Sequence, residues 1–433
     1  SSAASDVYKR QMFRFAVDKL LKPNGFTSFI TTSSWFFLSS FEKLRNYMLT
    51  NYQFTSIVDY GTELFDGKVG HNPIVSWVLQ KTKPYTALTA VRLVDYCFSR
   101  RNEKQTEFFE NRNRYFAKQE NFSKIPGAPV AYWVSENFVS IFDYANIYSI
   151  AEVQEGLKTG DNERFIREWY EVSFVNTNMY SDGDVKWYFH TKGGDFRKWY
   201  GNMNEVLNYE NNGAELKAFK GSCLAGIQNY FRANITYNRI SSSKTSFRYT
   251  DKKSIPNMAG LALYAKDDND INYVLAWLNS DIVRIVLSIV NPTLNFPPGT
   301  IGKLPIMIDE FRKPSINDLV QENISLSKTD WDSFETSWDF KKPPLLKAMS
   351  SAAWANENTD EGFTVRSAFE IWERMCNDRF NTLKRNEEEL NRIFIDIYGL
   401  QDELTPEVED RDVTVRKADL QREIKSLISY AVG

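Results

Sequence analysis

The sequence contains few of the side chains that metal centres and nucleophilic enzymes use most. It has three cysteines, Cys97, Cys223 and Cys376, and two histidines, His71 and His190. The cysteines are too far apart for a CxxC metal site or a disulfide framework, and no HExxH motif is present. We therefore expect neither a zinc centre nor a serine triad, and a reducing cytoplasm is the expected location. The histidines are expected to be structural or exposed to solvent.

Long apolar runs are also missing. No stretch reaches the roughly 18 residues that a membrane span needs, and the first residues lack the apolar core of a signal peptide. We therefore expect no membrane contact. Residues 1–11, SSAASDVYKRQ, resemble translated linker sequence. We expect this segment to be non-native, and Met12 to interrupt a longer protein rather than to begin one.

Charge is unevenly distributed along the chain, although the formal net charge is only −3. Residues 184–253 hold twelve Lys or Arg against six Asp or Glu, whereas residues 386–415 hold ten acids against two bases. The local excess of cations favours contact with a polyanion. The acidic run is interpreted as a solvated face or a partner surface rather than as a catalytic group.

The basic region contains the segment KGGDFRKWYGNMNEVLNY, residues 192–209. Glycines allow a close backbone approach, cations bind phosphates, aromatic rings stack, and asparagines present forked donors to base edges. A second such stretch, ITYNRISSSKTSFRY, covers residues 235–249. The DNA contacts predicted from the two stretches are Lys192, Gly193, Gly194, Arg197, Lys198, Trp199, Asn202, Arg239, Ser242, Lys244 and Arg248, with Ser241 as a further candidate.

Two alternatives to DNA contact remain open at this point. Cations beside Trp199 and Tyr200 also fit a surface ladder of cations and aromatic rings without any ligand. Thr159, Gly160, Asp161 and Asn162 could contact DNA, but ordinary turn chemistry explains them and is preferred.

Apolar periodicity predicts alternating helices and strands in the first part of the chain. Helices are expected over residues 13–22 and 41–49, and strands over residues 26–32, 54–61 and 74–80. This order is typical of a doubly wound α/β sheet that lacks its front half.

The later part of the chain is expected to contain more helix. Residues 273–290 are predicted to form one apolar core helix, followed by a short strand that ends at Ile306. Helices are also expected over residues 368–398, with Gly399 as an end signal, and over residues 418–432. The paired prolines in Phe296-Pro297-Pro298-Gly299 and Lys342-Pro343-Pro344-Leu345 are expected in turns or linkers.

The order of the early motifs resembles the late part of amino-type, adenine-specific DNA methyltransferases. The segments that carry this resemblance are LLKPNGFTSFITTSSWFF, FEKLRNYML, FTSIVDYGTELFDG and HNPIVSWVLQK. Downstream, EGLKTGDNERFIREWYEV, KGGDFRKWYGN, LNSDIVRIVLSIVNPTLNFPPGTIGKLPI and EEELNRIFIDIYGLQDEL are similar to the PglX methyltransferases of BREX phage-defence systems. The resemblance covers nearly all of the chain from Phe13 onward.

The resemblance implies an α/β fold in four parts. Residues 12–100 would form the C-terminal half of a Rossmann-like methyltransferase sheet, and residues 101–150 a connector. Residues 151–310 would form an α+β target-recognition domain, followed by a helical C-terminal region over residues 311–433. The parent protein would transfer a methyl group from S-adenosylmethionine to adenine N6 in double-stranded DNA. Other proteins of the defence system are compatible with it as partners.

Two elements of such enzymes are missing from the sequence. It has neither the glycine-rich cofactor loop nor the Asn or Asp followed by Pro-Pro-Tyr or Pro-Pro-Phe, so we assign no catalytic residue and expect no tight cofactor binding by this chain. Phe65, in GTELFDG, matches the position of an aromatic residue that stacks on the flipped adenine. A hydrophobic contact at the end of a loop explains Phe65 equally well.

Two other kinds of DNA-binding protein remain alternatives. A stand-alone specificity subunit of the type I kind would have two recognition domains separated by long helices, whereas this sequence shows one, preceded by methyltransferase-like strands. A restriction endonuclease fused to a methyltransferase would need a nuclease domain upstream of Phe13.

Overall fold

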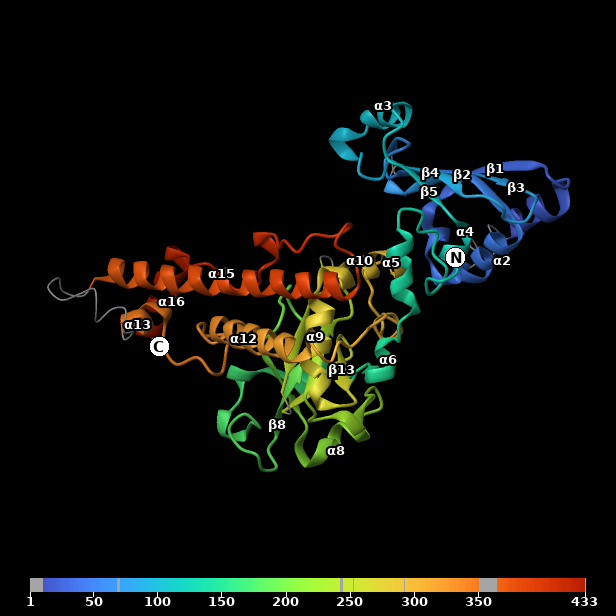
Figure 1. Ribbon diagram of the computed structural model, residues 1–433. Coiled ribbons are helices and arrows are strands. Elements are labelled where there is room, and N and C mark those ends of the chain that lie inside the picture. Colours follow the sequence, from blue (N-terminus) through green and yellow to red (C-terminus); the bar gives the residue numbers. More distant parts are fainter. Residues whose placement is uncertain are drawn as a thin grey trace. The chain divides into compact units, whose positions relative to one another are not determined.

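The computed structural model describes residues 11–67, 71–241, 244–251, 253–291, 293–349 and 364–432. The fold is mixed α/β (Figure 1). The chain divides into two compact units: Ser1–Ala145 with Val286–Pro292, and Asn146–Ile285 with Thr293–Gly433. Apart from Gln11, the expected linker over residues 1–11 lies outside the described residues.

The first unit is built on a five-stranded sheet with the order β1-β3-β2-β4-β5. Its strands are β1 (Phe26–Thr32), β2 (Gln53–Gly61), β3 (Ile74–Gln80), β4 (Leu88–Arg92) and β5 (Arg114–Ala117). Because β3 runs antiparallel to both β1 and β2, these two strands share one direction, and α2 (Glu42–Asn51) connects them. β2 and β4 are parallel. The predicted strands over residues 26–32 and 74–80 match β1 and β3 residue for residue.

Aromatic side chains fill the core of this unit. The rings of Trp35 and Trp77 lie 5.5 Å apart, and Phe54 stacks on Trp35. Arg45 of α2 is 1% exposed and donates to the backbone oxygens of Trp35 and Ala128 at 2.9 and 3.1 Å. The shorter helices of the unit are η1 (Phe15–Leu20, a π-helix), α3 (Glu103–Phe109), α4 (Gln119–Phe122) and α5 (Glu136–Ser140).

The second unit contains two four-stranded sheets, with the orders β11-β10-β13-β6 and β12-β8-β9-β7. The first sheet is antiparallel, and in the second only β12 and β8 are parallel. The strands are β6 (Ala151–Gln154), β7 (Ile166–Glu168), β8 (Trp187–Thr191), β9 (Glu205–Asn208), β10 (Asn234–Asn238), β11 (Phe247–Thr250), β12 (Ser254–Pro256) and β13 (Gly260–Ala265).

Helices complete the second unit. They are α6 (Ile147–Ile150), α7 (Asn162–Phe165), α8 (Glu210–Ala218), α9 (Ile271–Asn279), α10 (Asp281–Val290), α11 (Pro298–Gly302), α12 (Lys313–Trp331), α13 (Pro344–Met349), α15 (Val365–Ile397) and α16 (Leu420–Val432), with the second half of α10 grouped with the first unit. In Figure 1, α12 and the long α15 lie beside one another. Gly399, with a φ of +66°, follows the end of α15 as predicted.

The predicted single helix over residues 273–290 is wrong at Ser280. This residue has an extended backbone (φ −74°, ψ 157°) and separates α9 from α10. Its hydroxyl donates to the oxygen of Trp277 at 2.7 Å, so the side chain satisfies a backbone acceptor at the break. The strand predicted before Ile306 is reduced to one bridge between Asn146 and Pro305. The proline pairs predicted as turns instead begin short helices at Pro298 and Pro344.

In the part of the chain that the structure describes, no single helix has the length and apolar character needed to cross a membrane, and only the bent pair formed by residues 268–279 and α10 passes that test by composition.

Candidate nucleic-acid interface

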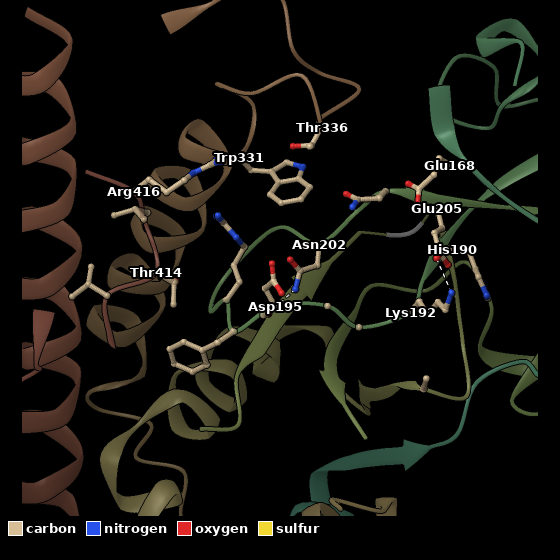
Figure 2. Close-up of a pocket in the computed structure, with 18 of the residues that line it drawn as sticks. Glu168, His190, Lys192, Asp195, Asn202, Glu205, Trp331, Thr336, Thr414 and Arg416 are labelled. Carbon is tan, nitrogen blue, oxygen red and sulfur yellow. Dashed lines mark hydrogen bonds and ion pairs between the residues drawn. The ribbon is translucent and has the colours of Figure 1, made fainter. Parts of the chain in front are cut away.

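A cavity of about 970 Å³ lies in the second unit (Figure 2). The segment from Lys192 to Asn202 forms much of its wall. The ends of β7 and β8 and the start of β9 contribute Glu168, His190 and Glu205. Trp331 of α12 and the loop over residues 411–416 complete the lining. The predicted recognition segment and the predicted helical region thus build one site together.

The glycine pair of the segment is required by its backbone. Gly193 and Gly194 have φ angles of +118° and +136°, which side chains disfavour. A Cβ atom on Gly194 would lie 2.8 Å from the side chain of Asn202. The Asn202 amide donates to the Asp195 oxygen at 2.9 Å, and Asn238 donates to the Gly194 oxygen at 2.6 Å. The turn therefore has one defined geometry at the cavity wall.

Polar groups with spare hydrogen-bonding capacity line the same cavity. Lys192 pairs with Glu205 through Oε1 at 2.8 Å. Glu205 Oε2 and the side-chain oxygen of Asn204 are buried and have no hydrogen-bond partner among the described residues. Burial, together with the nearby charges of Glu205 and Glu171, raises the pKa of Glu168. Glu168 is partly exposed, so its carboxyl group is open to hydrogen-bond donors of a ligand, such as base amino groups.

His190 has a structural role in the wall of the cavity. One ring nitrogen, Nδ1, lies 2.7 Å from the oxygen of Ile255, and the other lies 3.0 Å from the amide nitrogen of Asn257. A neutral ring satisfies both contacts, with Nδ1–H as donor and Nε2 as acceptor. Burial lowers the pKa of His190 to about 4.

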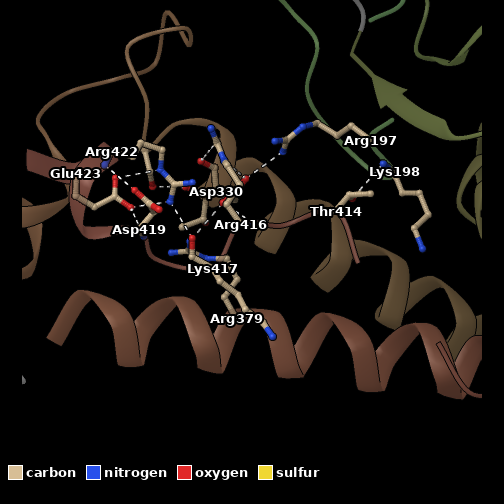
Figure 3. A network of polar contacts seen from close by, with 12 residues as sticks. Arg197, Lys198, Asp330, Arg379, Thr414, Arg416, Lys417, Asp419, Arg422 and Glu423 are labelled. Carbon is tan, nitrogen blue, oxygen red and sulfur yellow. Dashed lines mark hydrogen bonds and ion pairs between the residues drawn. The ribbon is translucent and has the colours of Figure 1, made fainter. Parts of the chain in front are cut away.

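Arg197, Lys198 and Trp199 are buried, with 9%, 7% and 1% of their surface exposed. Arg197 pairs with Asp330 at 3.1 Å (Figure 3), and Lys198 pairs with Glu387. The Trp199 indole donates to Glu387 at 2.7 Å. The prediction that these three side chains contact DNA directly finds no support here, because their polar groups already have partners inside the protein. The structure gives them an internal role.

The cations of the second basic stretch, residues 235–249, also include both buried and partly exposed side chains. Arg248 is 1% exposed, and its guanidinium donates to the Arg197 oxygen at 3.2 Å and to Asn238 at 3.0 Å, so it also supports the fold from inside. Arg239 and Lys244 are partly exposed and pair with Glu155 and Asp412. Ser242 lies outside the described residues.

The turn interpretation of residues 159–162 fits the structure. Thr159 donates to the Asn162 side chain at 2.5 Å, and Asp161 caps α7 by accepting from the Arg164 backbone N–H at 3.1 Å. Gly160, with a φ of +76°, packs its Cα against the backbone of Gly221. These residues form a tight turn at the start of the second unit.

In the first unit, Phe65 lies in the loop after β2 and is 45% exposed. Its neighbour Asp66 pairs with Arg101 at 2.6 Å. An exposed ring is available for stacking, but it is equally an ordinary loop residue, so its role as a base platform stays a prediction.

Several residues of the site were not predicted from the sequence. Glu168, Asn204 and Glu205 line the cavity, while Asp330 and Glu387 hold the recognition segment from behind. The only sequence signal was the charge balance: Glu387 and Asp412 belong to the acidic run over residues 386–415, and they pair with Lys198 and Lys244 of the basic region. The partner surface expected for the acidic run therefore includes this chain's own basic region.

Comparison with known proteins identifies related sequences over the whole chain. A family model described as Eco57I restriction-modification methylase matches residues 1–65. The chain is 38% identical over 455 aligned residues to an adenine-specific methyltransferase PglX from Lacticaseibacillus casei (strain Zhang), with 100% of the chain and 37% of the relative covered. It is 30% identical to an adenine-specific methyltransferase BrxX from Escherichia coli O9:H4 (strain HS), covering 98% of the chain and 35% of that protein.

The chain thus spans little more than a third of either relative. Among solved structures, the type IIL restriction-modification enzyme MmeI in complex with DNA is similar with a TM-score of 0.47 and 10% identity, covering 96% of this chain and 55% of that one. A nuclease-deletion mutant of the type ISP enzyme LlaGI in complex with a DNA substrate mimic gives a TM-score of 0.40 at 10% identity, covering 76% of this chain and 31% of that one.

Proposed function

We propose that this chain, which is PglX-like in sequence along its whole length, is the DNA-recognition part of an adenine-specific DNA methyltransferase of a phage-defence system. The observation that carries the proposal is its similarity to two such enzymes, combined with a polar cavity built around the segment KGGDFRKWYGN. The complete protein would methylate adenine N6 in double-stranded DNA. This chain alone would bind DNA without methylating it.

The residues present do not fit S-adenosylmethionine. The sequence contains neither the glycine-rich loop nor the Pro-Pro-Tyr or Pro-Pro-Phe motif that such enzymes use, and no residue is assigned to the cofactor. The complete protein would bind the cofactor through residues outside this chain. This chain is therefore given no step of the methyl transfer.

The edge of the first sheet supports a continuation of the methyltransferase fold. Strand β1 is at the end of the strand order, and Phe26 and Ile30 on it are 60% and 64% exposed. Among the described residues, no strand pairs with the outer edge of β1. Apolar side chains on an unpaired edge are typical of a surface that another segment covers. We propose that the remaining strands of the catalytic sheet pair there.

DNA contact is assigned to the exposed part of the recognition surface. Lys192, Arg239 and Lys244 keep 40%, 30% and 36% of their side chains exposed, and each pairs with a carboxylate that a phosphate could displace. Gly193, Gly194 and Asn202 bring backbone and amide groups to the cavity wall. Phe65 remains the proposed stacking platform for an extruded adenine in the complete enzyme.

A binding and transfer assay tests this function. Fluorescence anisotropy on duplex DNA should show affinity that falls steeply with salt, because cations that bind phosphates release counterions. Transfer of tritiated methyl groups to mixed genomic DNA should not exceed a no-enzyme control. Absence of DNA binding at low salt, or methyl incorporation by this chain alone, would contradict the proposal.

In a chain completed with the missing part of a PglX relative, Phe65→Ala should reduce methyl transfer more than DNA binding, and equal losses would favour a packing role.

A further inference from the structure

The recognition segment has an unfavourable backbone where it leaves the cavity. Trp199 and Asn202 have φ angles of +70° and +59°, and Gly201 between them has a φ of +124°. A positive φ is uncommon for residues other than glycine, most of all for a bulky one such as tryptophan. Such conformations persist when the surrounding structure imposes them, and they gather at functional sites. Some part of the second unit must therefore hold this segment.

Two buried carboxylates of the helical region, Asp330 (Figure 3) and Glu387, contribute to that restraint. Asp330 at the end of α12 is 1% exposed and accepts from Arg197 and from the Arg416 guanidinium, each at 3.1 Å, and from the Arg416 backbone N–H at 3.0 Å. Glu387 of α15 is 5% exposed and accepts from Lys198 and Trp199. Three consecutive residues of the segment are thus anchored to two different helices.

The loop before α16 adds a third anchor on the same side. The hydroxyl of Thr414 accepts from the Lys198 backbone N–H at 3.1 Å. The Arg416 guanidinium lies over the ring of Phe334 at 3.3 Å, which fixes the loop against the helical region. These three anchors are more than one hundred residues away in sequence, for example 133 residues between Arg197 and Asp330. Strand β11 also holds the segment, because the Trp199 backbone bonds to Phe247 and Tyr249 at 3.0 and 2.9 Å. The position of the segment is thus set by β11 together with the packed helices.

The same segment lines the cavity, and the anchoring residues Thr414 and Arg416 line it as well. Asp195 and Asn202 lie close together at its wall, joined by the bond from the Asn202 amide to the Asp195 oxygen (Figure 2). A shift of Arg197, Lys198 and Trp199 would move Asp195, Asn202 and the glycine pair relative to the rest of the cavity lining. The geometry of the cavity wall thus depends on the ion pairs that Asp330 and Glu387 make with this segment and with Arg416.

We propose that Asp330 and Glu387 are positioning residues for sequence-specific DNA recognition, which hold the segment over residues 197–202 so that its cavity face has a single geometry. This inference rests on the proposed function of the site. Glu387 neutralises Lys198, whereas Asp330 is shared by Arg197, Arg379 and Arg416. In this proposal Arg197 and Lys198 use their donor groups on these carboxylates and not on phosphates. Loss of the anchors lowers the preference for one DNA sequence, whereas the affinity for DNA in general is maintained by the exposed cations.

The physical basis is the cost of burying charge. A buried carboxylate requires its cation partners in a fixed arrangement, so a buried ion pair specifies a geometry even where it adds little stability. Base reading requires such a fixed geometry, since hydrogen bonds to base edges are directional.

The experiment compares folded variants of the complete 433-residue chain by two readouts. One is enrichment of sequences from a randomised duplex pool, and the other is the salt dependence of anisotropy on a fixed duplex. The main variant is Lys198→Met combined with Glu387→Gln, which removes both charges together and leaves an acceptor for the Trp199 indole. Asp330→Asn tests the second anchor. The matched control is Glu389→Gln, the same change on the same helix at a residue that pairs only with exposed Arg392 among the described residues.

We expect the double variant and Asp330→Asn to lose about tenfold in enrichment, comparable to the loss of one good base contact, with affinity on the fixed duplex within about twofold. Glu389→Gln should match the wild type. Unchanged enrichment by the folded double variant overturns the inference, as does a salt slope lowered by about one, which would show that Lys198 binds phosphate.

Two further outcomes are decisive. If the double variant does not fold, Arg197→Lys takes its place, because it keeps the charge beside Asp330 but loses the planar donor; unchanged enrichment then overturns the inference. A wild-type chain that binds DNA without enriching any sequence overturns the inference alone. A wild-type chain that binds no DNA contradicts the proposed function.

Discussion

The six cations predicted to bind DNA divide into a buried group and an exposed group. Arg197, Lys198 and Arg248 are at most 9% exposed and contact groups inside the protein, whereas the side chains of Lys192, Arg239 and Lys244 are 30% to 40% exposed. Both groups belong to one basic stretch of sequence. A local excess of cations therefore indicates a charged region, but not which of its members face a ligand.

The two groups also differ in what their carboxylate partners do. Asp330 and Glu387 are themselves buried, so their pairs with Arg197 and Lys198 are shielded from water and salt. Burial raises the pKa of Glu387, although its contacts with Lys198 and Trp199 oppose that shift. The carboxylates that pair with exposed cations are at least partly open to solvent, and such pairs add little to stability.

Removing one buried cation should give the largest effect. Lys198→Ala leaves Glu387 buried without its ion partner, so the free energy of unfolding should fall by about 3 to 5 kcal/mol. Chemical denaturation at pH 7 measures this loss. The matched exposed variant, Lys192→Ala, should lose less than about 1 kcal/mol, since Lys192 is 40% exposed. Similar losses in both variants would remove the distinction between the two groups.

His190 differs from both groups of cations, because it is buried as a neutral ring. Its pKa is about 4 in the folded protein and 6.5 for an ordinary histidine, so the unfolded chain binds more protons between these values. Stability is complete above about pH 6.5 and decreases as the pH falls towards 4. Between pH 7 and pH 5 the loss should be about 2 kcal/mol.

Denaturation of the wild type and of His190→Gln at both pH values checks this contribution. The variant should lose less stability than the wild type over the same interval. His71→Gln is the matched control, because it makes the same replacement at a histidine that is exposed. A variant at His190 with the full wild-type dependence would assign the effect to other groups.

The exposed cations should affect stability least and salt dependence most. Lys192→Gln, Arg239→Gln and Lys244→Gln should each change the free energy of unfolding by less than about 0.5 kcal/mol, as is usual at surfaces. Each should also lower the salt slope of DNA binding by about one, if its cation binds a phosphate. Anisotropy over a salt series measures the slope. An unchanged slope in all three variants would show that DNA binds elsewhere on the protein.

Local sequence patterns were sufficient to predict a helix or strand where one face of that element packs against the core. The strands β1 and β3 follow from alternation, and the helix end at Gly399 follows from a residue that accepts a positive φ. The same reasoning failed at Ser280, because an apolar run on both sides of a helix break carries no periodic signal of the break. The order of the motifs also predicted the resemblance to PglX, and the similarity over 100% of this chain and 37% of the relative confirms it.

The sequence by itself determined the charge segregation, most elements of the first sheet and the glycine pair at positions 193 and 194. Only the tertiary structure decided which cations are buried, that Glu387 and Asp412 of the acidic run face the basic region, and that Asn204 and Glu205 line a cavity. The physical reason is the range of the interactions. Turn and strand preferences act between neighbouring residues, whereas burial and ion pairing join residues such as Lys198 and Glu387, 189 positions apart, once the helices have packed.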